Sequence, residues 1–540
     1  MRIYEYINKN KKFFLILIII GIFIVSITVR YWPIFHKGFS YNIAVDDLIL
    51  ARNLSLVGEY KIDNEKNVFL SSEVVKEKGI ISNFGNKLTP ILYSKVFNLF
   101  GFNQGIPSHV SLILYGIVSV LLFVLVLKLF NVWVASIFSF IEIFSPLIIT
   151  EAIQPGFLEW ATLFLGVSLL IYLWKEKPNL FRLFLAGLFF GFASLARNSY
   201  LLSFFPFLIY DFWKARSFKR AIIFILPLLI CWSVYLGPAF IEKGIIENNY
   251  LSREETTSSY MHIFPDPYTW HFERDAYVED VKETTNYTYS EYLIKYGYPI
   301  SFKNKILMYL SSVLSYPKGL FAQITIGGPF LVFFLIVGGF YLYKRRKELL
   351  RLFILWTGIL YLLLVINKSN HWGHFVALQL PIFLLISLGV YWFIRLILKQ
   401  DFKTYLKYLL IFGFIITLFL HLIQSDKWAF HEGYLYSKTD RILELVKVVK
   451  EQKGEMDKKN DTIAVGSPNS QAPAFLNWYT DFSSVYFNPV TVKRLLQENK
   501  LQWAFDQFGV TKVVGYDRDL TEKILRATNV ESIAIFSSEP

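Results

Sequence analysis

Residues 45–60 read VDDLILARNLSLVGEY and follow the first long apolar segment of a chain of 540 residues. The stretch begins with two adjacent carboxylates, Asp46 and Asp47. Ionisable side chains are costly beside lipid and are generally kept there for a functional reason. The stretch therefore predicts a polar site at the surface of a membrane.

The composition of the chain favours a membrane protein and excludes several other classes. Hydrophobic residues make up 54% of the chain, aromatic residues make up 18%, and the mean hydropathy is +0.41. These values are typical of a polytopic α-helical membrane protein. The net charge of +13 comes from short basic clusters between apolar segments, so we expect no nucleic-acid partner. The single cysteine, Cys231, excludes an internal disulfide and a thiolate metal cluster.

Apolar runs predict about eleven transmembrane helices. The first of them is expected to remain as an anchor, because no small-residue cleavage site follows it. The predicted spans are residues 13–30, 108–130, 132–150, 157–174, 180–196, 198–213, 219–240, 319–343, 350–366, 374–396 and 404–424.

Basic clusters orient these predicted spans. All of the basic clusters fall on one side of the membrane, which is predicted to be the cytoplasmic side. This predicts a cytoplasmic N-terminus in a multi-pass protein of the plasma membrane. The clusters are Lys9/Lys11/Lys12, Lys175/Lys177/Arg182, Lys214/Arg216/Lys219/Arg220, Lys344/Arg345/Arg346/Lys347/Arg351 and Arg395/Lys399/Lys403/Lys407. The same count places the loops 31–107 and 241–318 and the C-terminal segment outside the cytoplasm.

The C-terminal segment differs from the rest of the chain. Residues 462–466 and 510–515 read as strands, with a helical stretch from Val492 to Asn499 between them. We therefore expect a membrane module over residues 1–430 and a small soluble α/β domain over 431–540, outside the cytoplasm. No GxGxxG fingerprint accompanies these strands, so no nucleotide is assigned to them.

The order of the motifs resembles that of the C-type glycosyltransferase (GT-C) superfamily. A basic anchor helix precedes a long outer loop with the acidic pair and ARNLSLVGEY (51–60), then GNKLTPILYSKVFNLFG (85–101) and helices joined by short loops. The likeness is greatest to the branch of protein O-mannosyltransferases and lipid A aminoarabinose transferases. It implies an enzyme that transfers a sugar from a polyprenyl-phosphate donor to an extracytoplasmic acceptor, which is a glycan, a lipid or a protein.

Such a transfer needs a base that takes the proton of the acceptor. Family members carry an essential Asp as the leading residue of an acidic pair, which is Asp46 here. Asp47 is its rival, because adjacent side chains on a helix point about 100° apart and only one of them is expected to face the site. The alternative is that the pair only favours the start of a helix, where Asp is a common cap.

A second carboxylate is expected at the start of the fourth membrane helix. Glu159 in PGFLEWATLF (155–164) matches the family position better than Glu151, and the resemblance implies that it orients the acceptor or helps to bind a metal. Oxygen ligands would suit Mg²⁺ or Mn²⁺, but no cofactor is assigned because metal dependence varies across the superfamily. Alternatively, the acid is there because the helix dipole favours it.

The departing phosphate needs cations to hold it. Arg197 in SLARNSYLL (194–202) and Lys87 in GNKLTP stand where relatives place basic residues near the carrier phosphate. Arg197 could instead be an anchor that reaches the interface. The resemblance also allows His371 and His374 to assist at the phosphate or the acceptor, although single interfacial histidines are often structural.

The alternative function is a flippase or other transporter of lipid-linked glycans. Transporters usually bury ionisable groups near the membrane midplane and often contain repeated halves. Here the notable charges fall in outer loops and no duplication is visible, so the sequence favours an enzyme. A polymerase or ligase acting on larger lipid-linked glycans would differ in its donor rather than in its chemistry.

Overall fold

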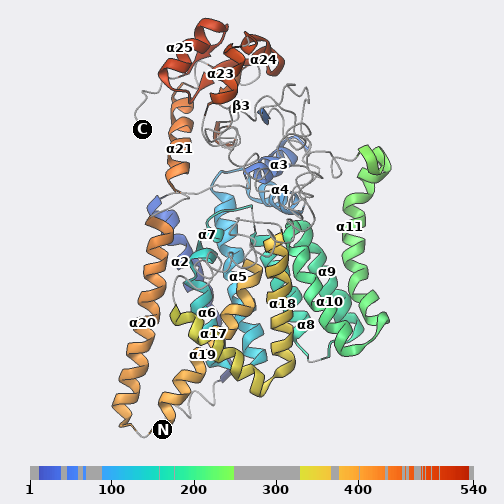
Figure 1. Cartoon of the computed structure of the whole chain (residues 1–540), viewed down its shortest axis with the longest axis vertical. Coiled ribbons are helices and arrows are strands. Elements are labelled where there is room, and N and C mark those ends of the chain that lie inside the picture. The colour runs from blue at the N-terminus through green and yellow to red at the C-terminus, as the bar shows by residue number, and fades with distance from the viewer. Residues whose placement is uncertain are drawn as a thin grey trace, which may run out of the picture.

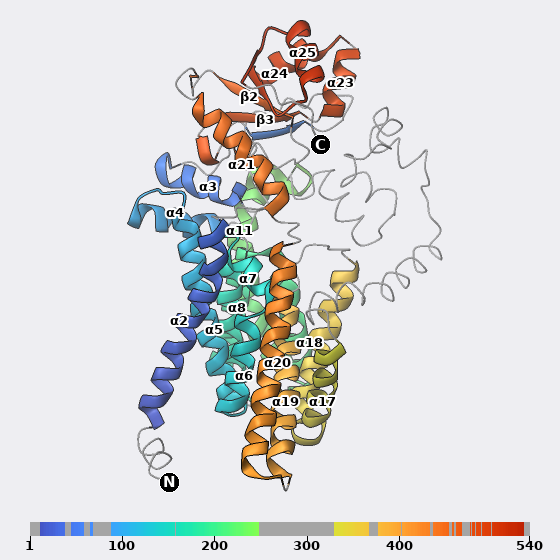
Figure 2. The ribbon, with the colours of Figure 1, turned by 90° about the vertical axis from the view of Figure 1, so that its left-hand side faces the viewer.

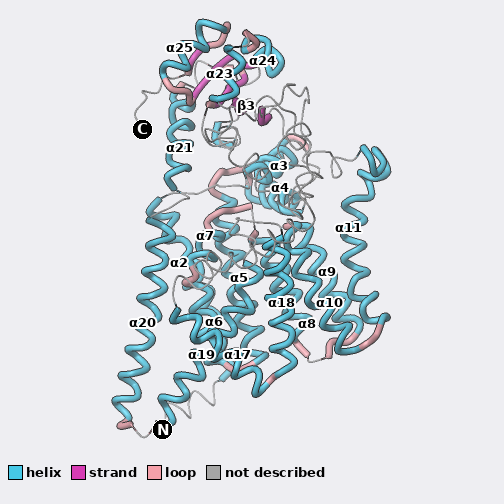
Figure 3. Tube along the Cα trace, viewed as in Figure 1, coloured by secondary structure: helices cyan, strands magenta, loops and turns pink. Residues whose placement is uncertain are grey.

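A computed structural model gives the fold, with a bundle of long helices below a smaller β-sheet layer (Figure 1). Helices account for most of the ordered elements (Figure 3). The structure describes residues 11–37, 45–58, 65–68, 88–156, 158–175, 177–247, 329–366, 376–400, 402–431, 436–452, 456–457, 461–466, 476, 478–480, 482–487, 489–497 and 499–533.

The bundle holds the largest apolar core, which extends from Tyr115 to Leu418. The helices of the bundle, long and short, are rich in apolar residues, as expected of segments surrounded by lipid and by other helices. They are α2 (Lys11–Lys37), α5 (Ile106–Leu129), α6 (Val132–Ile143), α7 (Pro146–Ala152), α8 (Glu159–Leu173), α9 (Leu180–Ala196), α10 (Phe204–Ala215), α11 (Phe218–Glu247), α17 (Pro329–Arg345), α18 (Lys347–Ile366), α19 (Val376–Lys399) and α20 (Thr404–His431), with the 3₁₀ turn η1 (Asn198–Ser203).

Three helices in the described part of the chain are long and apolar enough to cross a membrane. They are Lys12–Ile34, Ile106–Leu129 and Val376–Lys399. The mostly helical architecture expected from the sequence is therefore confirmed, while the count of about eleven spans stays a prediction.

Two of the predicted spans are not continuous helices. The span predicted over 132–150 is interrupted because Ser145 has an extended backbone, with ψ of 121°, before Pro146 begins α7. A residue before proline is disfavoured in the helical region. The span predicted over 198–213 contains η1 and then α10, whose 12 residues reach about 18 Å, against roughly 30 Å of hydrocarbon.

Helices α17 and α19 approach each other closely, because each presents a glycine to the other. A Cβ atom at Gly338 would overlap the carbonyl oxygen of Leu385, and one at Gly389 would overlap that of Phe334. Small residues permit this close approach of backbones between helices in a membrane. The contact fixes the pairing of these two helices.

The basic turns lie together at one end of the bundle. The α10–α11, α17–α18 and α19–α20 turns are at its lower end in Figure 1, and the sheet stands beyond the opposite end. This arrangement agrees with the grouping of basic clusters on one side. Which side is cytoplasmic stays a prediction.

The sheet has five parallel strands in the order β1-β3-β2-β4-β5. The strands are β1 (Glu65–Val68), β2 (Thr462–Val465), β3 (Ser483–Phe487), β4 (Val510–Val514) and β5 (Glu531–Ser532), accompanied by α23 (Pro489–Gln497), α24 (Leu501–Phe508) and α25 (Arg518–Ala527). The two strands predicted in the C-terminal segment and the helix between them are confirmed. The domain division at residues 430 and 431 stays a prediction.

Strand β1 comes from the N-terminal part of the chain, after α2, and not from the C-terminal segment. It pairs with β3 in a register that joins Glu65 to Ser484 and Val68 to Phe487. The two ends of the chain therefore build one sheet, which the sequence did not predict.

Helices α3 (Val45–Leu56) and α4 (Leu88–Phe100) lie between the bundle and the sheet, beside α21 (Tyr436–Glu451), as Figure 2 shows. A second apolar core joins them: residues 48–51 of α3 and Tyr93 of α4 are buried with Leu445 of α21 and with Trp478. This layer carries the acidic pair. Its packing therefore ties the acidic pair to the C-terminal segment.

Candidate active site

Ionisable side chains from four elements meet where the bundle faces the α3–α4 layer. Asp47 lies on α3, Glu151 on α7 and Glu159 at the start of α8, while Arg197 follows the last residue of α9. Arg197 interacts electrostatically with Asp47 and Glu151, and Glu151 also interacts with Glu159. The fold therefore brings together three of the acidic residues singled out in the sequence and one of the basic residues, Arg197.

Glu159 is fully buried and its carboxylate is held by three donors. Its Oε1 accepts hydrogen bonds from the backbone N–H of Gly156, at 2.7 Å, and from the hydroxyl of Tyr93, while its Oε2 accepts one from the N–H of Leu158, at 3.1 Å. Gly156 has φ of 89°, a left-handed conformation that glycine adopts without strain. Glu159 thus fixes the turn before α8 and attaches it to α4.

Glu151 lies in a different environment. It is buried, and within the described residues its Oε2 has no hydrogen-bond partner. Burial raises the pKa of Glu151 from the ordinary 4.5 to about 8; Arg197 acts against this shift and Glu159 with it. A carboxyl with this pKa is mostly protonated at neutral pH and can gain or lose a proton near it.

Arg197 is half-buried at the C-terminal end of α9. Its neighbour Ala196 accepts a hydrogen bond at 3.1 Å from the hydroxyl of Thr89 on α4, so this end of α9 is attached to the layer above the bundle. A guanidinium can form paired hydrogen bonds with phosphate oxygens. The position suits a contact with an anion that enters between the bundle and the α3–α4 layer.

The acidic pair occupies the first turn of α3, which begins at Val45. Asp47 is 7% exposed, and the five residues from Leu48 to Arg52 are buried as well. This part of the helix is therefore buried on all sides. The helix dipole also favours an acid at this end of α3, independently of any catalytic role. The side chain of Asp46 lies outside the described residues, as do Lys87, His371 and His374.

The whole fold is similar to those of two solved membrane proteins. One is the archaeal oligosaccharyltransferase AglB from Archaeoglobus fulgidus, in complex with an inhibitory peptide and a dolichol-phosphate: the match covers 95% of this chain and 70% of AglB, with a TM-score of 0.53 and 13% identity. The other is ArnT from Cupriavidus metallidurans bound to undecaprenyl phosphate: the match covers 96% of this chain and 89% of ArnT, with a TM-score of 0.52 and 9% identity.

This chain has the fold of the C-type glycosyltransferases. The fold inferred from the order of the motifs is thus confirmed, and ArnT is among the proteins that share it. No protein-family model and no curated protein matches the sequence.

In this C-type fold, the described residues do not supply a complete metal site. No group of three or more His, Cys, Asp or Glu side chains that could hold a metal ion occurs among them. Glu159 already accepts three hydrogen bonds, so it is poorly suited to act as a ligand. A structure of the Archaeoglobus oligosaccharyltransferase contains Zn and sulfate, with a TM-score of 0.50.

A buried ion pair lies deeper in the bundle and was missed in the sequence. Nη2 of Arg30 on α2 lies 2.7 Å from Oε1 of Glu142 on α6, and neither side chain is more than 2% exposed. Ser119 on α5 accepts a hydrogen bond from Arg30 at 3.0 Å and donates one to Glu142 at 2.8 Å. Charged residues inside apolar runs are the signal that could have found this network.

Proposed function

We propose that this chain is a membrane glycosyltransferase that moves a sugar from a polyprenyl-phosphate donor to an extracytoplasmic acceptor. The observation that carries the proposal is Arg197, half-buried and within electrostatic reach of Asp47 and Glu151. Such a cluster provides both a cation for a phosphate and a carboxylate for a proton. The similar folds support this kind of reaction, since AglB was solved with dolichol-phosphate and ArnT with undecaprenyl phosphate.

In the proposed step, a nucleophilic oxygen or nitrogen of the acceptor attacks the anomeric carbon of the sugar. The bond from that carbon to the phosphate oxygen breaks, and the electron pair leaves with the polyprenyl phosphate. Asp47 takes the proton of the acceptor as general base. Arg197 donates hydrogen bonds to the phosphate, which gains negative charge as the bond breaks.

The remaining candidates take supporting roles in the proposal. Asp46 is the alternative base, because it is the residue that matches the leading Asp of the family. Glu159 holds the turn before α8 and, through Tyr93, the position of α4. Lys87, His371 and His374 keep the roles at the phosphate or the acceptor that the resemblance implies.

Reconstitution tests the proposal. Purified protein in proteoliposomes, given a panel of polyprenyl-phosphate sugars and an extract of envelope glycans, is expected to release polyprenyl phosphate and to label an acceptor. Protein omitted from the liposomes gives the background. If the donor instead crosses the bilayer intact, without release of polyprenyl phosphate, the chain is a flippase and the proposal is wrong.

A further inference from the structure

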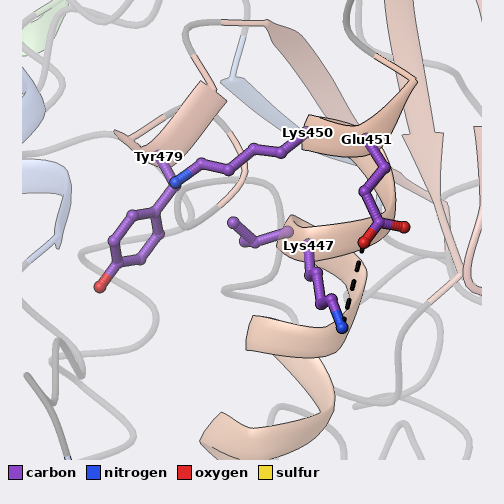
Figure 4. A pocket seen from close by; sticks show the side chains of 5 residues that line it. Lys447, Lys450, Glu451 and Tyr479 are labelled. Atoms are coloured by element: carbon purple, nitrogen blue, oxygen red, sulfur yellow. Dashed lines mark ion pairs between the residues drawn. The ribbon is translucent and has the colours of Figure 1, made fainter.

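A hollow lies beside α21, and Figure 4 shows the side chains that line it. Its volume is about 350 Å³, within the range of roughly 300–1,000 Å³ that is usual for small-molecule sites. The residues that line it are Val446, Lys447, Lys450, Glu451 and Tyr479. None of the residues proposed above for catalysis lines it, so the hollow is a separate site.

The lining combines apolar surface with an excess of positive charge. Nζ of Lys450 lies 5.2 Å from the centre of the Tyr479 ring, and Nζ of Lys447 lies 3.9 Å from Oε1 of Glu451. Both members of the Lys447–Glu451 pair are well exposed, so their interaction is weak and Lys447 can exchange its partner. Two ammonium groups and one carboxylate leave one positive charge to attract an anion.

This combination suits a sugar that carries a negative charge. An aromatic face accepts the apolar C–H side of a pyranose ring, while a lysine ammonium neutralises a carboxylate or a phosphate on the same unit. The carboxylate of Glu451 can accept hydrogen bonds from sugar hydroxyl groups. An uncharged glycan would leave the remaining positive charge of the lining without a counter-ion.

The location of the hollow argues against a lipid headgroup as the ligand. Lys447 and Lys450 lie about 16–21 Å along α21 from Tyr436, where the helix begins after α20. They are therefore at the end of α21 that approaches the sheet, away from the bundle (Figure 2). A ligand that reaches them comes from the aqueous side.

The hollow is also attached to the layer that carries the acidic pair. Tyr479 directly follows Trp478, whose ring lies 6.4 Å from that of Phe97 on α4 and 6.0 Å from the guanidinium carbon of Arg52 on α3. Val446 belongs to the same buried core as residues 48–51. A ligand in the hollow would thus bind next to the packing that holds α3.

We propose that this hollow binds a negatively charged saccharide unit of the acceptor. That the saccharide belongs to the acceptor rests on the proposed function. The unit stacks on Tyr479 and pairs its carboxylate or phosphate with Lys447 and Lys450. The acceptor is then an anionic glycan held by the C-terminal segment, while its reacting end reaches the site below.

A binding measurement on the full chain tests the hollow without any donor. The probes are oligogalacturonate, which is anionic, and an uncharged maltooligosaccharide of equal length. We expect the anionic probe to bind at least tenfold more tightly. We also expect Lys447→Glu combined with Lys450→Glu to weaken it by at least tenfold, because two charge-assisted contacts become repulsive.

The matched control is Lys523→Glu, combined with Arg526→Glu, on α25. These side chains are well exposed, and the change of charge is the same as in the test variant. The control is expected to bind like the unaltered chain. Equal binding of the two probes, or equal losses in the test and control variants, would overturn the proposal. Tyr479→Leu separates stacking from charge and should weaken the anionic probe with the lysines intact.

The outcome is separable from that of the proposed function. If the chain transfers sugar but charge reversal at Lys447 and Lys450 leaves the KM for the acceptor unchanged, the hollow is not an acceptor site. The proposed enzyme function then stands. If the anionic probe binds tightly, charge reversal abolishes this binding and no polyprenyl phosphate is released, the proposed enzyme function is wrong. The hollow is then still a site for an anionic saccharide.

Discussion

The guanidinium carbon of Arg52 lies 6.0 Å from the centre of the Trp478 ring, which joins the helix of the acidic pair to the C-terminal segment. Trp478 is fully buried, its ring lies 5.3 Å from that of Phe102, and its carbonyl oxygen accepts a hydrogen bond from Gln104 at 3.0 Å. Trp478 thus contacts α3 through Arg52, and it contacts the segment after α4 through Phe102 and Gln104. We expect this packing to hold α3, and with it Asp47, in position.

Replacing Trp478 is expected to lower kcat more than it changes the KM for the donor. Trp478→Ala removes the support of α3, and a misplacement of about 1 Å can lower a rate by about 100-fold. Trp478→Phe keeps a ring in the core and should retain most of the activity. Steady-state kinetics with a polyprenyl-phosphate sugar measure both values.

Trp503→Ala is the control for this change, because Trp503 on α24 is 48% exposed. Thermal unfolding is followed in parallel, since loss of a buried tryptophan destabilises a core by about 3–5 kcal/mol. An unchanged kcat in folded Trp478→Ala would show that Trp478 has no part in positioning α3.

Arg197 is expected to act on the affinity for the donor. Hydrogen bonds to a charged group contribute about 1.5–3 kcal/mol, so Arg197→Ala should raise the KM for the donor by about 10- to 100-fold. Arg197→Lys keeps the charge but loses the paired hydrogen-bond geometry. Its KM for the donor should lie between that of Arg197→Ala and that of the unaltered chain. Arg351→Ala, at an arginine whose side chain is 51% exposed, is the control. Equal donor affinities in all four proteins would return Arg197 to a structural role.

Glu151 predicts a pH dependence of donor binding. Because its pKa is about 8, the carboxyl is neutral at lower pH and becomes negative as the pH rises through that value. The new charge competes with the phosphate for Arg197, so the KM for the donor should rise above pH 8. Glu151→Gln stays neutral and should remove this rise. A rise of the same size in Glu151→Gln would assign it to another group.

The same shift has a consequence for stability that can be measured without a substrate. The pKa of Glu151 is raised in the folded chain relative to the ordinary 4.5. Its contribution to folding is therefore fully present below about pH 4.5 and is lost as the pH rises through about 8. Thermal unfolding of Glu151→Gln should depend less on pH across this window than that of the unaltered chain.

The ion pair of Arg30 and Glu142 predicts a large effect on stability. Glu142→Leu leaves the Arg30 charge buried without its partner, which should destabilise the fold by about 3–5 kcal/mol. Adding Arg30→Met replaces the second charge by an apolar group as well. The double variant should regain most of the lost free energy of unfolding. Unfolding midpoints in detergent compare the variants. A double variant as unstable as Glu142→Leu would contradict this account of the pair.

Local features of the sequence predicted most of the described helices and two of the C-terminal strands, β2 and β4, but not β3 and β5. The span expected over 180–196 is α9, because the side chain of Asn179 caps its first turn and the apolar run stops at Arg197. The strands at residues 462–465 and 510–514 also follow from short apolar runs with polar ends. Such signals lie within a few residues of one another, so they can be read directly.

Relationships between distant segments could not be predicted in this way. Nothing near Glu65 indicates that it would pair with Ser484, and the four elements that carry Asp47, Glu151, Glu159 and Arg197 meet only in the fold. The sequence also gave no sign that Glu159 would accept three hydrogen bonds while Glu151 would keep an oxygen without a partner. The donors to Glu159 come from the turn that precedes α8 and from Tyr93 on α4, which lies 66 residues earlier in the chain.

The rate of polyprenyl-phosphate release by Asp47→Asn tests the central claim most directly. The substitution keeps the size of the side chain and removes the base, so turnover should fall by about 100- to 10,000-fold, with the donor still bound. Asp46→Asn, measured beside it, should keep most of the activity. Turnover of Asp47→Asn at the rate of the unaltered chain would contradict the account.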